Sequence, residues 1–270
     1  MNAFLNHFSF EFRTGIRNRT LLLMTYLFPL VVYAILGALM TAVNPTFGET
    51  MIPAMVIFAI LSGTLLSLPD VLVTARNAGI FRSYRINGIP AVSILLIPAL
   101  SALLHLMLLA AIITVTAPFF FHAPLPVNWP SFVLIFMLMV SACAGLALLI
   151  GVVSSSSQMT VLWAQAIFLP SMLLGGLMLP VSILPGALAR LALLLPTTHA
   201  MNAFRGLAQN LTPDFNPLWS IIILLLGTVL AFGLAIYLFT WDKTDARQRK
   251  RTPLALLALL PYVVGMFLLA

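Results

Sequence analysis

The chain has 270 residues, of which 62% are hydrophobic and only 7% are charged, and its formal net charge is +7. This composition excludes an ordinary soluble domain, in which about a quarter of the residues are charged, and six or so helical spans of about 20 residues leave no room for a large one. The positive charges lie in small groups between apolar runs, as membrane topology requires, so they do not indicate a nucleic-acid partner. We therefore expect an all-α polytopic membrane protein.

The N-terminal segment has the pattern of an amphipathic helix. Phe4, Phe8, Phe12 and Ile16 recur every four residues with polar side chains between them. We expect residues 1–19 to form a helix that lies in the cytosolic membrane interface, with an irregular polar tail as the alternative.

Apolar runs long enough to span a bilayer follow this segment. The predicted spans are residues 20–42, 51–73, 91–117, 131–153, 159–179 and 218–241. In the fourth of them, small residues predict a face for close helix packing: Ser141, Ala142, Ala144, Gly145 and Ala147. A last apolar run, residues 254–270, would rise only about 25 Å as an α-helix, short of the ~30 Å hydrocarbon core. It is either a short seventh span or a segment in the interface, and we favour the span.

The connections on the outer side are marked by proline. Four prolines within residues 118–130 are expected to end the third helix. Residues 180–216 are apolar in part, yet a crossing there would place the basic cluster of residues 243–251 outside. We therefore expect short outer helices or a re-entrant hairpin, with Thr197 or Thr198 as the cap of a second short helix.

Lysine and arginine residues indicate the orientation. Three precede the first span, three lie between the second and third, and five follow the sixth, whereas the outer connections hold only two. Basic residues in short loops stay on the cytoplasmic side, so the N-terminus is predicted to be cytoplasmic.

Residues 73–90, VTARNAGIFRSYRINGIP, form the first long break that carries several positive charges and no negative one. The spacing of the apolar and aromatic side chains is compatible with one or two helical turns, which the Asn87-Gly88 pair would end. Aromatic residues flanked by arginines just below a membrane suit a groove on a soluble partner. A solvated loop near anionic lipid head groups is the alternative.

Few strongly polar side chains interrupt the spans. Asp70 is expected to pair with Arg76, with a proton site as the alternative, and His105 is expected to be a hydrogen-bonded core residue, with a substrate or relay role as the alternative. His105 and Gln165 are nearly the only strongly polar side chains in the middle of a span. The sequence contains no G-x-x-x-x-G-K-[ST] loop for ATP and no metal-spaced His, Glu or Cys cluster. A pore or carrier powered from outside the chain is favoured over an intramembrane serine hydrolase, which would need a serine and a histidine to meet at depth.

This pattern resembles the permease subunit of a type-2 ABC exporter over nearly the whole chain. The most specific local match is residues 169–207, whose matching positions are Pro170, Gly175, Gly176, Pro180, Pro185, Pro196 and Arg205. In the 73–90 break, Arg76, Gly79, Gly88 and Pro90 fit the family pattern. Ala75 and Asn77 stand where that family often has acidic residues, and the apolar run 254–270 is atypical.

The resemblance implies a six-helix permease core, homodimeric, in the bacterial inner membrane, that is not itself an enzyme. It implies a separate ABC ATP-binding subunit that carries ATP and magnesium, with no cofactor on this chain. The expected coupling residues are Arg76, Gly79, Phe81, Arg82, Tyr84 and Arg85, with Phe81 and Tyr84 as anchors. Asp70, His105 and Gln165 are the candidate pathway residues. The expected cargo is a drug-like, lipid-like or glycan amphiphile, with multidrug efflux favoured, and the alternative is an ATP-independent secondary carrier or channel.

Overall fold

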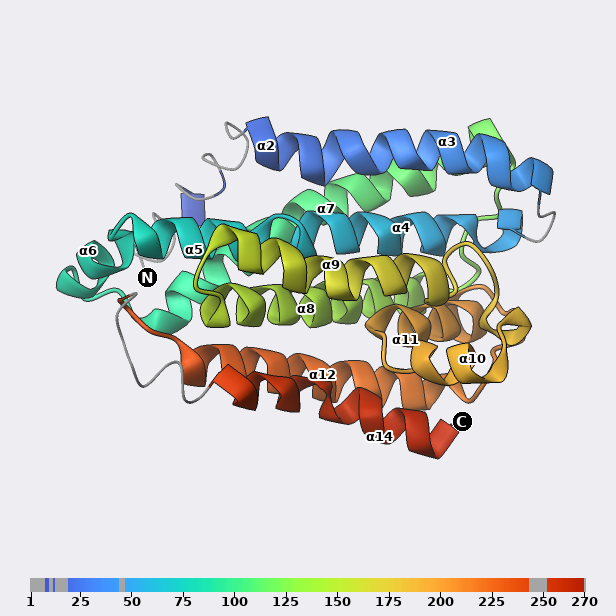
Figure 1. Cartoon of the computed structure of the whole chain (residues 1–270). Coiled ribbons are helices and arrows are strands. Elements are labelled where there is room, and N and C mark those ends of the chain that lie inside the picture. The colour runs from blue at the N-terminus through green and yellow to red at the C-terminus, as the bar shows by residue number, and fades with distance from the viewer. Residues whose placement is uncertain (1–7, 10–11, 13–18, 44–46, 243–251, 270) are drawn as a thin grey trace.

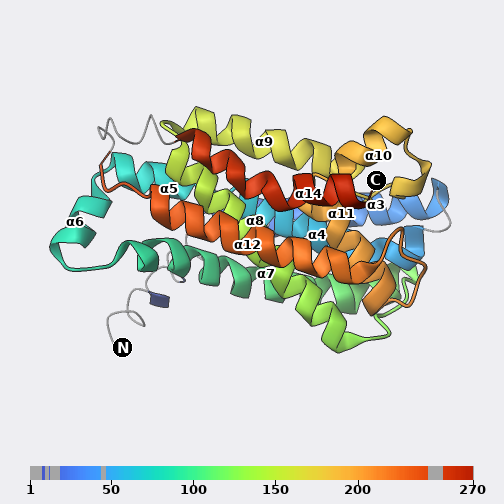
Figure 2. The same cartoon turned by 90° about the horizontal axis from the view of Figure 1, so that it is seen from below.

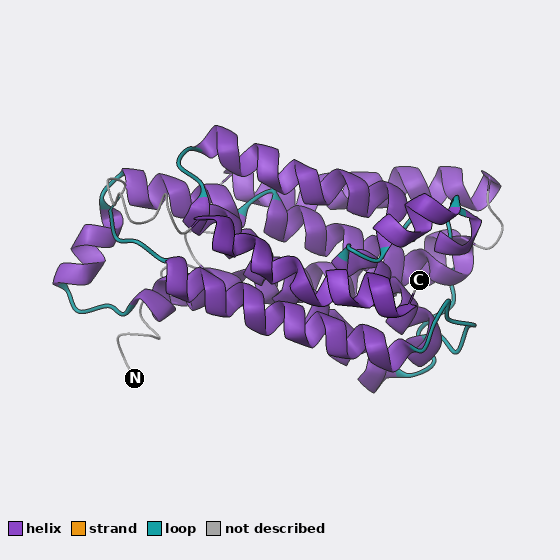
Figure 3. Cartoon of the chain, turned by 60° about the horizontal axis from the view of Figure 1, so that its bottom comes forward, coloured by secondary structure: helices purple, strands orange, loops and turns teal. Residues whose placement is uncertain are grey.

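The protein is a bundle of long helices. The computed structural model describes residues 8–9, 12, 19–43, 47–242 and 252–269, and these are almost entirely helical, with no strand among them (Figure 3). Seven helices in this part of the chain are long and apolar enough to cross a membrane. They lie side by side along one direction (Figure 1), so the predicted all-α polytopic fold is confirmed. Most of the predicted interfacial helix, residues 1–19, lies outside the described residues.

From Arg19 to Leu174, the described chain contains six helical segments and the short α6. In order these are α2 (Arg19–Leu22), the π-helical turn η1 (Leu23–Leu27) and α3 (Phe28–Val43), which form one continuous helix, then α4 (Phe47–Leu65), α5 (Leu68–Asn77), the short α6 (Ile80–Ile86), α7 (Ala91–Phe121), α8 (Trp129–Val153) and α9 (Ser157–Leu174). The short α6 projects from one end of the bundle (Figure 1).

Four short helices lie at the opposite end of the bundle (Figure 1). They are η2 (Val181–Ile183), α10 (Gly186–Ala192), α11 (Pro196–Ala203) and the π-helical η3 (Phe204–Ala208). The long α12 (Pro217–Leu238) then returns toward the end that holds α6, and the 3-10 helix η4 (Thr252–Leu259) and α14 (Leu260–Leu269) complete the described chain. The region predicted as short outer helices is therefore composed of short helices.

Helix α4 is the centre of the bundle. Nearly every side chain from Met51 to Leu65 is buried, on all faces of the helix, as expected of a helix that is apolar all round. In contrast, α3, α9 and α14 bury only a minor part of their surface. Their many exposed leucine, isoleucine and valine side chains form the apolar outside of the bundle.

Helices α8 and α12 pack closely because small residues lie between them. A Cβ atom at Gly145 would lie 3.0 Å from the Phe232 ring and 3.1 Å from the Ala231 Cβ. Farther along α8, a Cβ at Gly151 would lie 3.0 Å from the carbonyl oxygen of Pro69, at the start of α5. The predicted small-residue face is confirmed at Gly145, where α8 approaches α12 closely, while Gly151, which was not part of the predicted face, allows α8 to approach the backbone of α5.

The C-terminal segment lies along α12 and extends toward the end that holds α10 (Figure 2). Tyr262 on this segment is fully buried and contacts Gly227 of α12. Its first 8 residues are 3-10 helical and the next 10 are α-helical. Because a 3-10 helix rises about 2.0 Å per residue, the segment is about 31 Å long, longer than an α-helix would be. That length matches a ~30 Å hydrocarbon core, although the crossing itself stays a prediction.

Several predicted helix ends differ from the observed ones. Pro118 does not end the third helix, because it lies in the last turn of α7, which continues to Phe121 and ends at His122 in a left-handed conformation (φ 54°). The second predicted span is divided into α4 and α5, where Pro69 lacks the N–H that a continuous helix would need. The predicted fifth and sixth spans extend past the helix ends at Leu174 and Leu238.

The predicted threonine cap is also wrong. Helix α11 begins at Pro196 with Leu195 as its N-cap, and no side chain caps it. The Thr198 hydroxyl instead donates a hydrogen bond to the carbonyl of Ala192, at 2.6 Å.

We expect Gly145→Val to destabilise the bundle, because the added side chain would collide with α12. Overpacking of this kind costs about 1–3 kcal/mol of unfolding free energy. The measurement is the thermal unfolding midpoint of the detergent-purified chain. Gly233→Val is the matched control, since a Cβ at Gly233 on α12 meets no atom within 4 Å; equal midpoints for the two variants would contradict the expectation.

Candidate functional site

Helix α6 is held between two glycines in left-handed conformations. Gly79 (φ 75°) is its N-cap and Gly88 (φ 71°) follows its C-cap. Only glycine adopts such φ values without a steric cost, so the chain can turn sharply into α6 and out of it. The predicted short helix is present, and these two turns direct it away from the bundle (Figure 1).

Phe81 faces the bundle and not the solvent. Its side chain is only 3% exposed and packs on Phe239, which follows α12, with the ring centroids 5.4 Å apart. The prediction that Phe81 is a docking anchor is therefore wrong. Tyr84, the other predicted anchor, is half-buried against the core. Phe81 instead attaches α6 to the end of α12.

Two arginines of α6 also contact the segment after α12. Arg82 forms an ion pair with Asp242, and the Arg85 guanidinium lies 6.0 Å from the centroid of the Trp241 ring. The Arg82 side chain is 67% exposed, and exposed ion pairs contribute only about 0–1 kcal/mol. The buried aromatic contact of Phe81 therefore holds α6 in place, and the two arginines help to orient the helix.

Arg76 is buried and ties α5 to α8. Its guanidinium donates hydrogen bonds to the carbonyl oxygens of Val152, at 2.9 Å, and of Ser154. These carbonyls lie at the carboxyl end of α8, where backbone acceptors have no helical partner and the helix dipole favours a cation. The predicted pair with Asp70 is wrong, because residues six apart lie on different sides of a helix; Asp70 is exposed.

Four side chains of α6 remain available to a partner. Ile86 is 85% exposed and Ile80 is 41% exposed, and Arg82 and Arg85 lie on the same short helix. We call Ile80, Arg82, Arg85 and Ile86 the α6 surface. Ile86 is about 140° around the helix from Phe81, so a neighbour that covers one of them leaves the other exposed. The sequence therefore indicates that one of the two is exposed, but it does not indicate which one the end of α12 covers.

The polar residues of the spans do not form one site. His105 on α7 is buried, with its Nδ1 2.8 Å from the Tyr26 hydroxyl in η1, as expected of a hydrogen-bonded core histidine. Gln165 is half-buried on α9 and Asp70 is on α5. In the described part of the chain no hydrogen bond joins any two of these three residues, and no group of His, Cys, Asp or Glu could hold a metal ion.

The predicted motif of residues 169–207 lies at the opposite end of the bundle, around the carboxyl end of α9. Gly175 is the C-cap of α9, and a side chain there would collide with Thr197 of α11. Gly176 follows in a left-handed conformation (φ 81°). Of the predicted prolines, Pro170 lies within α9, Pro180 and Pro185 precede η2 and α10, and Pro196 begins α11. The motif residues thus determine how α9 joins the short helices.

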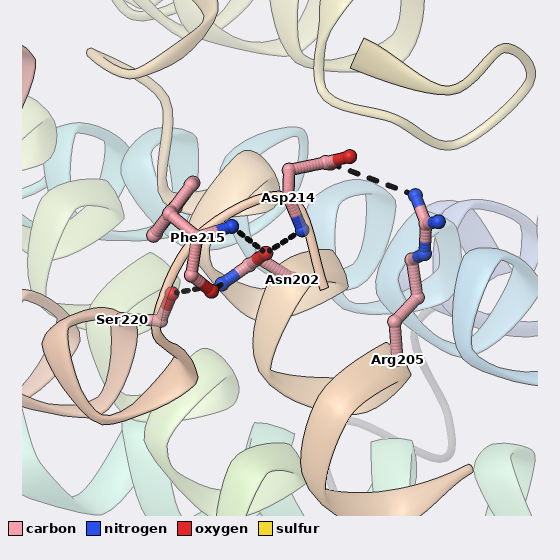
Figure 4. Close-up of polar contacts among 5 residues, drawn as sticks. All are labelled: Asn202, Arg205, Asp214, Phe215 and Ser220. Carbon is pink, nitrogen blue, oxygen red and sulfur yellow. Dashed lines mark hydrogen bonds and ion pairs between the residues drawn. The ribbon is translucent and has the colours of Figure 1, made fainter. Parts of the chain in front are cut away.

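Asn202 organises the loop between η3 and α12, as Figure 4 shows. Its side-chain amide donates to the carbonyl of Phe215 (2.9 Å) and to the Ser220 hydroxyl (3.1 Å). Its oxygen accepts from the backbone N–H groups of Asp214 (2.8 Å) and Phe215. The Asp214 carboxylate lies 3.5 Å from the guanidinium of Arg205. Asn202 was not predicted, because a single asparagine in a helix carries no signal for a loop that is distant in sequence.

His199 on α11 is fully buried beside Phe215 and Tyr262. Its Nε2 donates to the carbonyl of Leu193 at 2.9 Å, while the buried Nδ1 has no partner in the described part of the chain. Burial disfavours the charged imidazolium and lowers the pKa of His199 from 6.5 to about 4. The ring is therefore neutral at physiological pH.

One family of known proteins matches this chain. The model of the family described as ABC-2 type transporter matches residues 3–208, which is more than half of the chain. The matched stretch includes α6 and the short helices up to η3 and ends before α12. No curated protein and no solved structure matches the chain.

We expect Phe81→Ala to loosen α6 from the end of α12 and to lower the stability of the chain. Truncating a buried phenylalanine costs about 3–5 kcal/mol of unfolding free energy. The measurement is the thermal midpoint in detergent, compared with Ile86→Ala, which removes an exposed side chain from the same helix. A midpoint for Phe81→Ala equal to that of Ile86→Ala would contradict the observed packing.

We expect acid to destabilise the end of the bundle that holds α11. The folded pKa of His199 lies below its unfolded value of 6.5. Stability is thus complete above about pH 6.5 and is lost as the pH falls toward 4, by at most about 1.4 kcal/mol per pH unit. Thermal midpoints at pH 7.5 and 5.0 should differ more in the wild type than in His199→Gln. An equal difference in both proteins would exclude this role of His199.

Proposed function

We propose that this chain, which belongs to the ABC-2 type transporter family, is the membrane-spanning subunit of an ATP-driven exporter whose ATPase is a separate subunit that docks on α6. The chain is a transporter permease and not itself an enzyme. One observation carries the proposal. A short helix with two exposed isoleucines and two arginines projects from the bundle and is held there by buried contacts.

The composition of the α6 surface supports a protein partner. Ile86 and Ile80 offer apolar contacts, and Arg85 offers the charge that steers a partner. Arg82 is paired with Asp242, but its side chain is 67% exposed and can still donate hydrogen bonds that fix the orientation of the partner. The described loops at this end are short, and the sequence contains no phosphate-binding loop of its own. ATP and magnesium are therefore assigned to the partner subunit, and this chain is assigned no cofactor.

In the proposed mechanism, force from the partner enters the bundle through the contacts of α6. Helix α6 follows α5 directly, and Arg76 of α5 holds the end of α8. Through Phe81 and Phe239, α6 also contacts the end of α12. Closure of two ATPase subunits would displace α6, and packed helices transmit such a displacement as rigid bodies. The pathway would then open between this chain and a second copy.

The proposed orientation of the bundle in the membrane rests on the distribution of its basic residues. The described arginines of α5 and α6 lie at one end of the bundle, where α12 also ends. In the sequence, five basic residues within 243–251 come after α12. At the other end, Arg205 is paired with Asp214. We assign the α6 end to the cytoplasm of a bacterial inner membrane, with the N-terminus cytoplasmic. The exposed apolar faces of α3 and α9 are proposed to face a second copy in a homodimer.

The proposed cargo is an amphiphile of the drug-like, lipid-like or glycan kind. It would meet an interior rich in methionine, phenylalanine and aliphatic side chains. An ATP-independent carrier, the alternative, usually needs several coupled ionisable residues near the midplane. The described spans do not bring Asp70, His105 and Gln165 together into such a site. This arrangement favours the hypothesis of an ATP-driven exporter.

We expect Ile86→Ala to weaken the association with the ATPase subunit without unfolding the permease. Loss of an apolar contact at the centre of such an interface should weaken binding about tenfold or more. The measurement is co-purification from native membranes, with the bound chain identified by mass spectrometry and by ATP hydrolysis. Ile183→Ala is the matched control, because Ile183 is 61% exposed at the opposite end.

Two results would contradict this proposal. The first is an ATPase subunit retained equally by the wild type and by Ile86→Ala, which would place the docking surface elsewhere. The second is transport by the purified chain that depends on a proton gradient and not on ATP, which would favour the secondary carrier.

A further inference from the structure

A small cavity opens at the outer end of the bundle, among residues with no role in α6 docking. Its volume is about 110 Å³ and its lining includes Glu49, Thr50, Met178, Met201, Arg205 and Thr212. Pockets for whole drug-sized molecules measure about 300–1,000 Å³. This cavity is therefore of a size for one small chemical group, with room for a short alkyl part between the two methionines.

The charges at the cavity leave one carboxylate uncompensated. Arg205 lies 3.5 Å from the Asp214 carboxylate, so its positive charge is already balanced (Figure 4). Glu49 is exposed, and within the described residues no ion pair includes it. These three groups together carry one net negative charge. The cavity thus favours a cation over an anion.

The helix ends around the cavity also favour a cation over an anion. Met178 follows the carboxyl end of α9, and Thr212 follows that of η3. Carboxyl ends of helices carry a partial negative charge, equivalent to about half an electron each. The amino end of α4 also lies at the cavity, but its first turn already contains the carboxylate of Glu49. The other amino end there belongs to η2, whose N-cap Pro180 lines the cavity and which is only 3 residues long. The backbone therefore also favours a bound cation.

We infer that this cavity binds a primary ammonium group attached to a short alkyl segment. Glu49 pairs with the positive charge, the hydroxyls of Thr50 and Thr212 accept its N–H groups, and Met178 and Met201 contact the carbon atoms. This inference rests on the proposed function and deepens it, because it assigns a protonated amine to the amphiphile that leaves on the outer side.

The test is a titration of the full-length chain in detergent, observed by NMR of ¹³C-methyl methionine. The chain has 13 methionines, so the Met178 and Met201 signals are assigned with Met178→Leu and Met201→Leu. Propylammonium should shift both signals until saturation, whereas propan-1-ol and propionate should not. Equal shifts with propan-1-ol would indicate a merely apolar cavity, and shifts with propionate would indicate an anion site at Arg205; either result would overturn the inference.

Charge variants isolate the contribution of Glu49. Glu49→Gln should weaken propylammonium binding about tenfold, as expected for the loss of a charged partner. Glu49→Asp keeps the charge and should bind within about threefold of wild type. Asp70→Asn removes an exposed carboxylate from α5 and should leave binding unchanged. Unchanged binding in Glu49→Gln would overturn the inference.

The source of the ammonium group is tested in nanodiscs. Phosphatidylethanolamine presents a primary ammonium, whereas phosphatidylcholine does not. If the two methionine signals are shifted in phosphatidylethanolamine nanodiscs before any amine is added, the site accepts a lipid head group. If they are shifted only by added propylammonium, it accepts the amine of a free cargo. Absence of a shift in both conditions would overturn the inference.

This titration needs no ATPase, so the two proposals can fail separately. Failure to bind propylammonium in a chain that still co-purifies with an ATPase subunit would remove only the ammonium site. Saturable binding by a chain that never associates with an ATPase would remove only the exporter assignment.

Discussion

The absence of water in the hydrocarbon core constrains this structure more than any other factor. Every backbone N–H and carbonyl group there must find a partner within the protein, and a helix supplies these partners by itself. The requirement is hardest to meet where the helices end. At the end that holds α11, Asn202 alone satisfies groups on Asp214, Phe215 and Ser220, and Thr198 and His199 bond to the carbonyls of Ala192 and Leu193. Buried polar side chains thus replace water for the irregular backbone between α9 and α12.

At the end that holds α6, one buried cation and one buried aromatic contact fix the helix ends in the same way. Arg76 satisfies the carbonyls of Val152 and Ser154 at the end of α8. Phe81 covers Phe239 at the end of α12. Two segments that are distant in sequence are thereby fixed to the α5–α6 pair. Because Phe81 occupies one face of α6, Ile80 and Ile86 remain exposed on the rest of the helix.

Hydropathy and charge were sufficient to predict the helical bundle and its regular succession of spans, because each signal is local. Contacts between distant segments were not accessible in this way. Phe81 and Ile86 are both apolar residues of one short helix, and only the end of α12 determines which of them is buried. The separation of Asp70 from Arg76 did have a local signal, since residues six apart do not share a helix face. Asn202 had none, because its partners lie in a loop that other helices position.

Helix α12 connects the two ends of the bundle physically. At its carboxyl end it is followed by Phe239, which packs on α6, and near its amino end Ser220 bonds to Asn202 of α11. Arg205, one turn beyond Asn202, lines the cavity. Between these points α12 packs along α8 through Gly145 and along the C-terminal segment through Gly227. Contacts this close leave little room for α12 to bend, so under the proposed coupling a displacement applied at α6 would reach the cavity as a movement of the whole helix.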